Sequence, residues 1–175
     1  SLPAIFSEEE IIFLDEVGFS VSSRSSRGRS LMGTPAVAIV PAIRTRNISI
    51  CCAMNRNGIL FYKTSTRAFN GEIFIEFLKE LKEKIHEKRL KNIVLIMDNV
   101  RFYHMNEVKA LLDSFNYRIL YLPPYSPFLN PKENMFSKWK EITKRTNPSN
   151  ETDLMTAISN GSQLVTSDDC VGFFR

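Results

Sequence analysis

The sequence holds few of the residues on which many metal and disulfide sites depend. Its 175 residues include only three cysteines and two histidines. Cys51 and Cys52 are neighbours in a segment predicted to be a strand, where consecutive side chains point to opposite faces. They are therefore poor partners for each other or for one metal ion. We expect reduced cysteines in a reducing compartment, without a disulfide framework.

Motifs that mark several common enzyme classes are absent as well. The chain has no phosphate-binding loop of the form GxxxxGKS/T, no GxGxxG after a predicted strand, and no HExxH, CxxC or GxSxG motif. Together with the scarcity of histidine, these absences leave most nucleophilic and zinc-dependent chemistries without their usual residues.

The chain also lacks a long hydrophobic run and a recognisable signal peptide. No apolar run approaches the ~18 residues of a membrane span, and the first residues, SLP, do not begin a secretory signal. With 43% hydrophobic and 24% charged residues, the composition is that of an ordinary globular domain. We expect a fragment without membrane contact that is intracellular and not secreted: nuclear in a eukaryote, cytoplasmic or nucleoid-associated in a bacterium.

One stretch contains no acidic residue at all. Residues 17–71 carry eight Lys or Arg and no Asp or Glu, whereas residues 1–16 carry five acidic residues and no basic one. Such a basic stretch favours a polyanionic partner, and a solubilising surface is the alternative. Residues 20–33, rich in Ser, Arg and Gly, are predicted to form a mobile loop.

Hydrophobic periodicity predicts strands in the first part of the chain and alternating helices and strands afterwards. The expected strands are 11–14, 36–40, 48–54, 59–64, 92–97 and 117–122. The expected helices are about 17 residues from Asn70, then 108–115, a helix from 130–131, and 150–160 with Gly161 past its end. This order predicts a single α/β domain over residues 1–175, with one mixed sheet flanked by helices.

Three carboxylates occupy positions typical of a metal site. Asp15 and Asp98 each end an apolar strand, and Glu133 lies in the first turn of the third predicted helix. We expect Asp15 and Asp98 on adjacent parallel strands, with Glu133 reaching them from its helix. Oxygen ligands select Mg²⁺ or Mn²⁺ over zinc, and a pair of such ions supports in-line attack on phosphate.

Each of these carboxylates also has a purely structural interpretation. Asp15 and Asp98 could hydrogen-bond turn backbone. Glu133 follows Asn130 at the spacing of a capping box, which would make it a helix cap. His104 could contact a substrate phosphate or face solvent.

The motifs around the carboxylates resemble the catalytic domain of mariner-like transposases, in the DDE transposase and integrase superfamily. They are FLDEVGF at 13–19, MDN at 97–99 and LPPYSPFLNPKEN at 122–134, and the resemblance covers about residues 10–145. The 34 residues between Asp98 and Glu133 match the usual spacing of that family. Many relatives have His where this chain has Tyr103, and here His104 comes one residue later.

The resemblance implies a ribonuclease-H-like fold and a metal-dependent DNA transposase. In it, Asp15, Asp98 and Glu133 would be both the catalytic residues and the ligands of Mg²⁺ or Mn²⁺, with two ions expected. The enzyme would cleave phosphodiester bonds at transposon ends and join the freed 3′-hydroxyls to target DNA. The C-terminal helices, about 150–175, would complete the domain.

DNA is the expected partner, and the full-length protein is expected to be a homodimer. Candidate DNA contacts are Arg24, Arg27, Arg29, Asn99 and His104. Two alternatives stay open: a transposase-derived host protein that binds DNA without catalysis, and a non-transposing nuclease of the same fold. The complete acidic triad argues against the first alternative.

Overall fold

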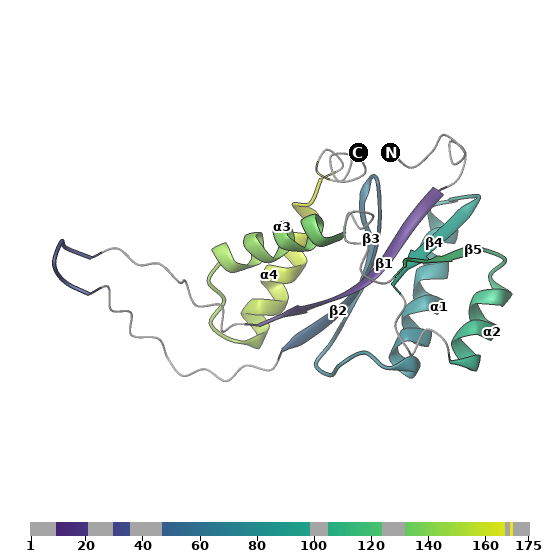
Figure 1. Cartoon of the computed structure of the whole chain (residues 1–175), viewed down its shortest axis with the longest axis horizontal. Helices are drawn as coiled ribbons and strands as arrows, with labels where there is room; N and C mark the ends of the chain where they lie inside the picture. The colour runs from purple at the N-terminus through teal and green to yellow at the C-terminus, as the bar shows by residue number, and fades with distance from the viewer. Residues whose placement is uncertain are drawn as a thin grey trace.

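A computed structural model of the chain shows a five-stranded sheet with helices on both faces (Figure 1). It describes residues 10–20, 30–35, 47–98, 105–123, 132–166 and 169, and only the backbone of Lys132 and Glu133. The elements in chain order are β1 (Glu10–Phe19), β2 (Ile48–Asn55), β3 (Gly58–Ser65), α1 (Gly71–Glu87), β4 (Ile93–Met97), α2 (Asn106–Ser114), β5 (Arg118–Tyr121), α3 (Lys132–Arg145) and α4 (Glu151–Gln163).

The strands lie in the order β3-β2-β1-β4-β5. β1 pairs antiparallel with β2, and β2 antiparallel with β3, whereas β1, β4 and β5 run parallel. The sheet is therefore mixed, as the order of predicted elements requires. β1 lies at its centre, hydrogen-bonded on both sides.

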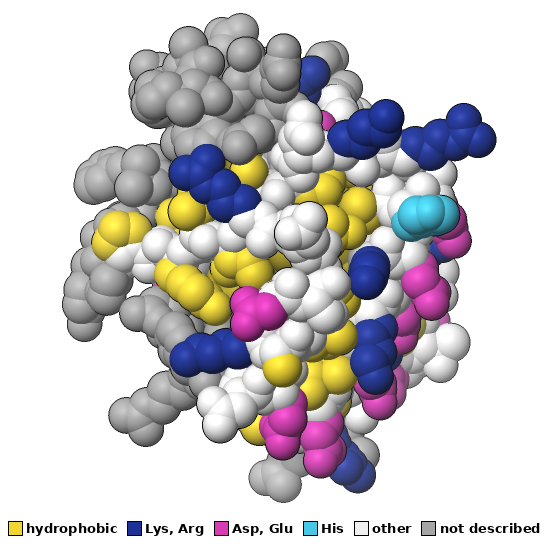
Figure 2. Space-filling view, turned by 90° about the vertical axis from the view of Figure 1, so that its right-hand side faces the viewer, with side chains coloured by type: hydrophobic (Ala, Val, Ile, Leu, Met, Phe, Trp, Pro, Cys, Tyr) yellow, Lys and Arg dark blue, Asp and Glu magenta, His cyan; other side chains and the backbone are white. Residues whose placement is uncertain are grey.

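The two faces of the sheet bury separate cores. α1 and α2 pack on one face around Leu14, Leu95 and Met97, and α3 and α4 pack on the other around Phe13, Ile96 and Trp139. Side chains alternate between the faces of a strand, so the apolar runs of β1 and β4 supply both cores. On the side of the molecule that carries α1 and α2, acidic and basic side chains are intermixed (Figure 2).

The hairpin from β2 to β3 forms where the sequence predicts it. Arg56 and Asn57 make the turn, and Gly58 has a φ of +128°, a conformation that favours glycine. Cys51 and Cys52 are both buried, are not joined in a disulfide, and belong to the cores on opposite faces. The prediction that they do not act together is confirmed.

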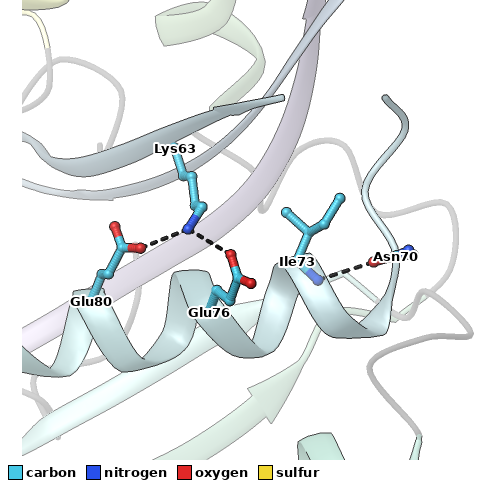
Figure 3. A network of polar contacts seen from close by, with 5 residues as sticks. All are labelled: Lys63, Asn70, Ile73, Glu76 and Glu80. Atoms are coloured by element: carbon cyan, nitrogen blue, oxygen red, sulfur yellow. Dashed lines mark hydrogen bonds and ion pairs between the residues drawn. The ribbon is translucent and has the colours of Figure 1, made fainter. Parts of the chain in front are cut away.

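α1 is fixed at its start and along its exposed side (Figure 3). The Asn70 side chain accepts a hydrogen bond of 3.0 Å from the backbone N–H of Ile73, which caps the helix. Lys63 of β3 reaches across to Glu76 and Glu80, with N–O distances of 3.0 and 2.6 Å. These contacts tie the edge strand β3 to the helix that covers it.

Two predicted boundaries are wrong. β1 does not end at Asp15 but continues to Phe19, because its pairing with β2 extends from Phe13 to Phe19. Gly161 does not follow α4 but lies within it, facing Trp139 of α3. The strand expected at 36–40 lies outside the described residues. Of the described helices, none is long and apolar enough to cross a membrane.

Gly161 allows α3 and α4 to approach each other closely. A Cβ at this position would lie 2.9 Å from Cδ1 of Trp139, a fully buried side chain whose Nε1 donates a 2.9 Å hydrogen bond to the Ile158 carbonyl. The indole is therefore held in place and cannot easily move aside. Glycine is retained here because of packing, despite its low helix propensity.

We expect Gly161→Ala to lower the free energy of unfolding by about 1–2 kcal/mol, because overpacking costs more than the ~1 kcal/mol gained in helix propensity. Asn160→Ala, at the exposed neighbouring position of the same helix, should raise it by a few tenths of a kcal/mol. Urea denaturation of both variants measures the difference. A Gly161→Ala protein as stable as Asn160→Ala would contradict the packing argument.

Candidate active site

Asp15 and Asp98 follow directly on the last residue pair that joins β1 to β4. In the parallel register Leu14 lies opposite Met97, and β4 ends there. The two aspartates are thus the next residues along adjacent parallel strands, which confirms that part of the prediction. Asp15, within β1, is half-buried, and Asp98, just past the end of β4, is exposed.

Both aspartates belong to the face of the sheet that α3 covers. Phe13 and Val17, two residues on either side of Asp15, are buried in the core with α3 and α4. Ile96 of β4 is buried in the same core. Alternation along each strand therefore assigns Asp15, and Asp98 one residue past β4, to that common face.

Backbone hydrogen bonds define the chain around the two aspartates. The N–H of Glu16 donates a 2.8 Å hydrogen bond to Oδ1 of Asp15. Beyond the end of β5, the N–H of Leu122 donates a 2.9 Å hydrogen bond to the carbonyl of Met97. The segment that leads from β5 towards α3 therefore starts beside Asp98.

Glu133 lies in the first turn of α3, as predicted. α3 runs in the same sense as β1 (Figure 1), and Trp139 packs edge-on against Phe19 at the end of the strand, with ring centroids 5.3 Å apart. Glu133 lies six residues before Trp139, about 9 Å along the helix. Asp15 lies four residues before Phe19, about 13 Å along the strand. Measured from the Phe19–Trp139 contact, Asp15 and Glu133 therefore both lie towards the N-terminal ends of β1 and α3.

Glu16 is a second half-buried carboxylate beside Asp15, and sequence reasoning gave it no role. It lies on the opposite face of the sheet, that of Leu14 and α1. Burial, and secondly the charge of Asp15, raise the pKa of the Glu16 carboxyl from 4.5 to about 7. The sequence did contain a signal for this site, namely two adjacent acidic residues within an apolar strand. Neighbouring carboxylates repel each other, so such a pair is unusual there.

Several predicted site residues lie outside the part of the chain that is described. They are Arg24, Arg27, Arg29, Asn99 and His104. Asn130, the proposed partner of Glu133 in a capping box, is also outside it. Among the described side chains, which do not include that of Glu133, no three His, Cys, Asp or Glu residues gather into a group that could hold a metal ion. The described donors are thus the oxygens of Asp15 and Asp98.

Comparison with known proteins matches this chain to a family model and to a bacterial relative. The family model described as DDE superfamily endonuclease matches residues 10–155. A 39 kDa protein of insertion element IS630 from Shigella sonnei is 23% identical over 139 residues, which cover 79% of this chain and 40% of that protein.

Solved structures of the Mos1 mariner transposase share the fold. The Mos1 strand transfer complex matches 97% of this chain and 51% of the Mos1 chain, with 16% identity and a TM-score of 0.79. The Mos1 catalytic domain with raltegravir and Mn matches 94% of this chain and 75% of that one, with 13% identity and a TM-score of 0.71. The fold is therefore ribonuclease-H-like. The chain spans less than half of the IS630 protein and about half of the longer Mos1 chain.

Mn²⁺ should bind at the two aspartates and raise the melting temperature, because a divalent ion relieves the repulsion between neighbouring carboxylates. Asp98→Asn should abolish this gain. Asp113→Asn, at an exposed position of α2, serves as the control and should keep it. Thermal melts with and without Mn²⁺ test this expectation. Equal gains in Asp98→Asn and wild type would show that the ion binds elsewhere.

Proposed function

Since the chain belongs to the DDE superfamily of endonucleases, we propose that it is the catalytic domain of a transposase that cleaves DNA at transposon ends and joins the 3′-hydroxyls to target DNA. The main support for the proposal is the β1–β4 register. Leu14 and Met97 are its last paired residues, and Asp15 and Asp98 are the next residue on each strand. Two unrelated turn-forming aspartates have no reason to share this place and this face.

The donor chemistry at the strand ends suits a hard divalent cation. Paired strands lie about 4.8 Å apart, so carboxylates that follow them on one face are close enough to share an ion. Asp15, Asp98 and Glu133 would hold Mg²⁺ or Mn²⁺, as a pair of ions, through oxygen atoms alone. Bound there, the metal supplies activation of the attacking oxygen and stabilisation of the leaving one. The Mn in the similar Mos1 catalytic domain supports this assignment.

The residues of this chain have distinct positioning roles in the proposal. Asp15 is anchored in the central strand, and its Oδ1 is oriented by the Glu16 backbone N–H. Glu133 is carried by α3, whose burial through Met135 and Trp139 fixes the helix on the same face as Asp15. A rigid sheet and a buried helix therefore keep the carboxylates at a constant separation while a phosphodiester is bound.

The proposed substrate is DNA, at transposon ends and at the target. We assign the catalytic unit to residues 1–175 as one domain, and we expect the full-length protein to act as a homodimer in the nucleus of a eukaryote or the nucleoid of a bacterium. Arg24, Arg27, Arg29, Asn99 and His104 are retained as proposed DNA contacts. The similarity to Mos1 complexes described as a strand transfer complex and a transpososome supports DNA as the partner.

A non-transposing nuclease of the same fold is the second candidate function. It would use the same carboxylates to hydrolyse DNA but would not join the product to another strand. Incubation with a pre-cut 3′-hydroxyl end and a target plasmid distinguishes the two, because only a transposase forms the joined product. A host protein that only binds DNA would yield neither product.

Replacing Glu133 by Gln tests whether this residue acts in catalysis or only caps α3. Gln keeps the size and the capping capacity of Glu, so a structural role predicts unchanged activity. A ligand role predicts that Mn²⁺-dependent nicking of plasmid DNA falls more than about 100-fold, since even residues that merely support metal ligands cost 10–100-fold when replaced. The melting temperature should not fall.

Glu72→Gln is the matched control for this experiment. Glu72 is the second residue of α1, as Glu133 is of α3, and it lies in the first turn of its helix. It should retain full nicking activity. If Glu133→Gln cleaves as fast as Glu72→Gln, then Glu133 is a cap and the proposed triad is wrong.

A further inference from the structure

A pocket of about 160 Å³ opens at the far end of β1 from the candidate active site. Gly18 and Ser20 line it from the end of β1, and Lys140, Thr143 and Lys144 line it from the last turns of α3. In Figure 1, β1 ends beside the end of α3 and the start of α4. None of the described residues that line the pocket is acidic.

The two lysines of the pocket differ from the other described cations of α3. Lys138 forms an ion pair with Asp169, and Arg145 forms one with Glu141. The ammonium groups of Lys140 and Lys144 have no ion-pair or hydrogen-bond partner within the described part of the chain. Two ammonium groups four residues apart on one helix face therefore meet at the pocket without a carboxylate to neutralise them.

A buried hydroxyl group next to these lysines is also without a partner. Thr143 is 2% exposed, and its Oγ1 is the buried side-chain polar atom that finds no hydrogen-bond partner among the described residues. Buried polar groups are almost always paired, and an exception calls for an explanation such as an absent ligand or water. Thr143 is one of the residues that line the positively charged pocket, and its Oγ1 lies at the contact of α3 with α4, 3.2 Å from where a Cβ at Gly161 would be.

We infer that this pocket binds a backbone phosphate of the DNA substrate, away from the bond that is cut. Two unpaired lysines beside a polar wall suit a phosphodiester, which carries one negative charge per nucleotide. The inference rests on the proposed function, because the phosphate belongs to the same DNA. It adds a contact region that lies outside the acidic triad.

The length of α3 sets the distance from this pocket to the site of cleavage. Lys144 in the last turn lies eleven residues after Glu133 in the first, which is about 16 Å of helix. If the duplex runs along α3, a rise of about 3.4 Å per base pair puts the bound phosphate roughly five base pairs from the scissile bond. The pocket would therefore hold flanking duplex and fix its register relative to the carboxylates.

A structural role for the lysines predicts a different result. Basic residues in the last turn of a helix stabilise its C-terminus, and Lys144 lies in the last turn of α3. If this were their whole role, their loss would lower the melting temperature and leave DNA binding unchanged. The two interpretations therefore separate when binding and stability are measured on the same variant.

The test is the salt dependence of binding to a duplex of about 20 base pairs of arbitrary sequence, in EDTA, followed by fluorescence anisotropy. Lys140→Gln/Lys144→Gln should make the slope of log K against log salt shallower by about 0.9, because one phosphate contact is lost, and should weaken binding about eightfold near 0.1 M salt. Lys140→Arg/Lys144→Arg keeps both charges and should preserve the slope. Thermal melts establish that each variant is folded.

Lys88→Gln/Lys91→Gln is the matched control. These exposed lysines precede β4, at the opposite end of the sheet from the pocket, and their removal changes the net charge by the same amount. The control should bind DNA as wild type does. A slope equally reduced in both double variants, or unchanged in Lys140→Gln/Lys144→Gln, would overturn the inference.

A metal-dependent nicking assay distinguishes an error in the assignment of the pocket from an error in the proposed function. If the pocket is wrong but the function is right, Lys140→Gln/Lys144→Gln binds and nicks like wild type while Asp98→Asn is inactive. If the function is wrong, Asp98→Asn nicks like wild type, whatever the lysine variants do. If both are right, the lysine variant binds DNA weakly and nicks more slowly than Lys88→Gln/Lys91→Gln, whereas Asp98→Asn binds DNA but does not nick.

Discussion

The parallel pairing of β1 with β4 is the constraint on which the candidate site depends. The two strands pair from Glu10 with Ile93 to Leu14 with Met97, and then β4 stops while β1 continues against β2. Asp15 is therefore in the interior of its own strand but at the end of its pairing with β4. The sheet is open on that side, so a carboxylate can be placed in the central strand without being buried between two neighbours.

The same pairing explains why these acids do not destroy the core. β1 alternates between the two buried cores up to Leu14, and after the break at Asp15 and Glu16 it supplies Val17 and Phe19 to the core of α3 and α4. Burying a charge is costly, and the rise in the pKa of Glu16 to about 7 reflects that cost. A sequence under selection for stability alone would place apolar residues at both positions, so this local conflict is itself an indication of a functional site.

The sequence was informative where one local signal determined the structure. NIVLIM became β4 because an apolar run of this length must be covered on both faces, and α1 followed from its periodicity and its Asn70 cap. It was misleading where a distant partner decided the outcome. β1 extends past Asp15 because of β2, and Gly161 stays inside α4 because of Trp139. No pattern within either segment reveals such partners, and the pocket at Lys140 and Lys144 likewise exists only through the packing of α3 beside the end of β1.

α3 connects the two parts of the proposed DNA-binding surface. Trp139 holds the middle of the helix through its hydrogen bond to the Ile158 carbonyl and its edge-on contacts with Phe19 and Tyr62. Glu133 lies on the N-terminal side of Trp139, and Lys144 lies on its C-terminal side. Because the helix is anchored between them, the distance from the carboxylates to the phosphate pocket is set before DNA arrives, and binding need not spend free energy on ordering it. A loop carrying the same residues would have to be ordered with each substrate. Placing both on one buried helix therefore converts contacts with flanking duplex into accurate placement of the scissile phosphate.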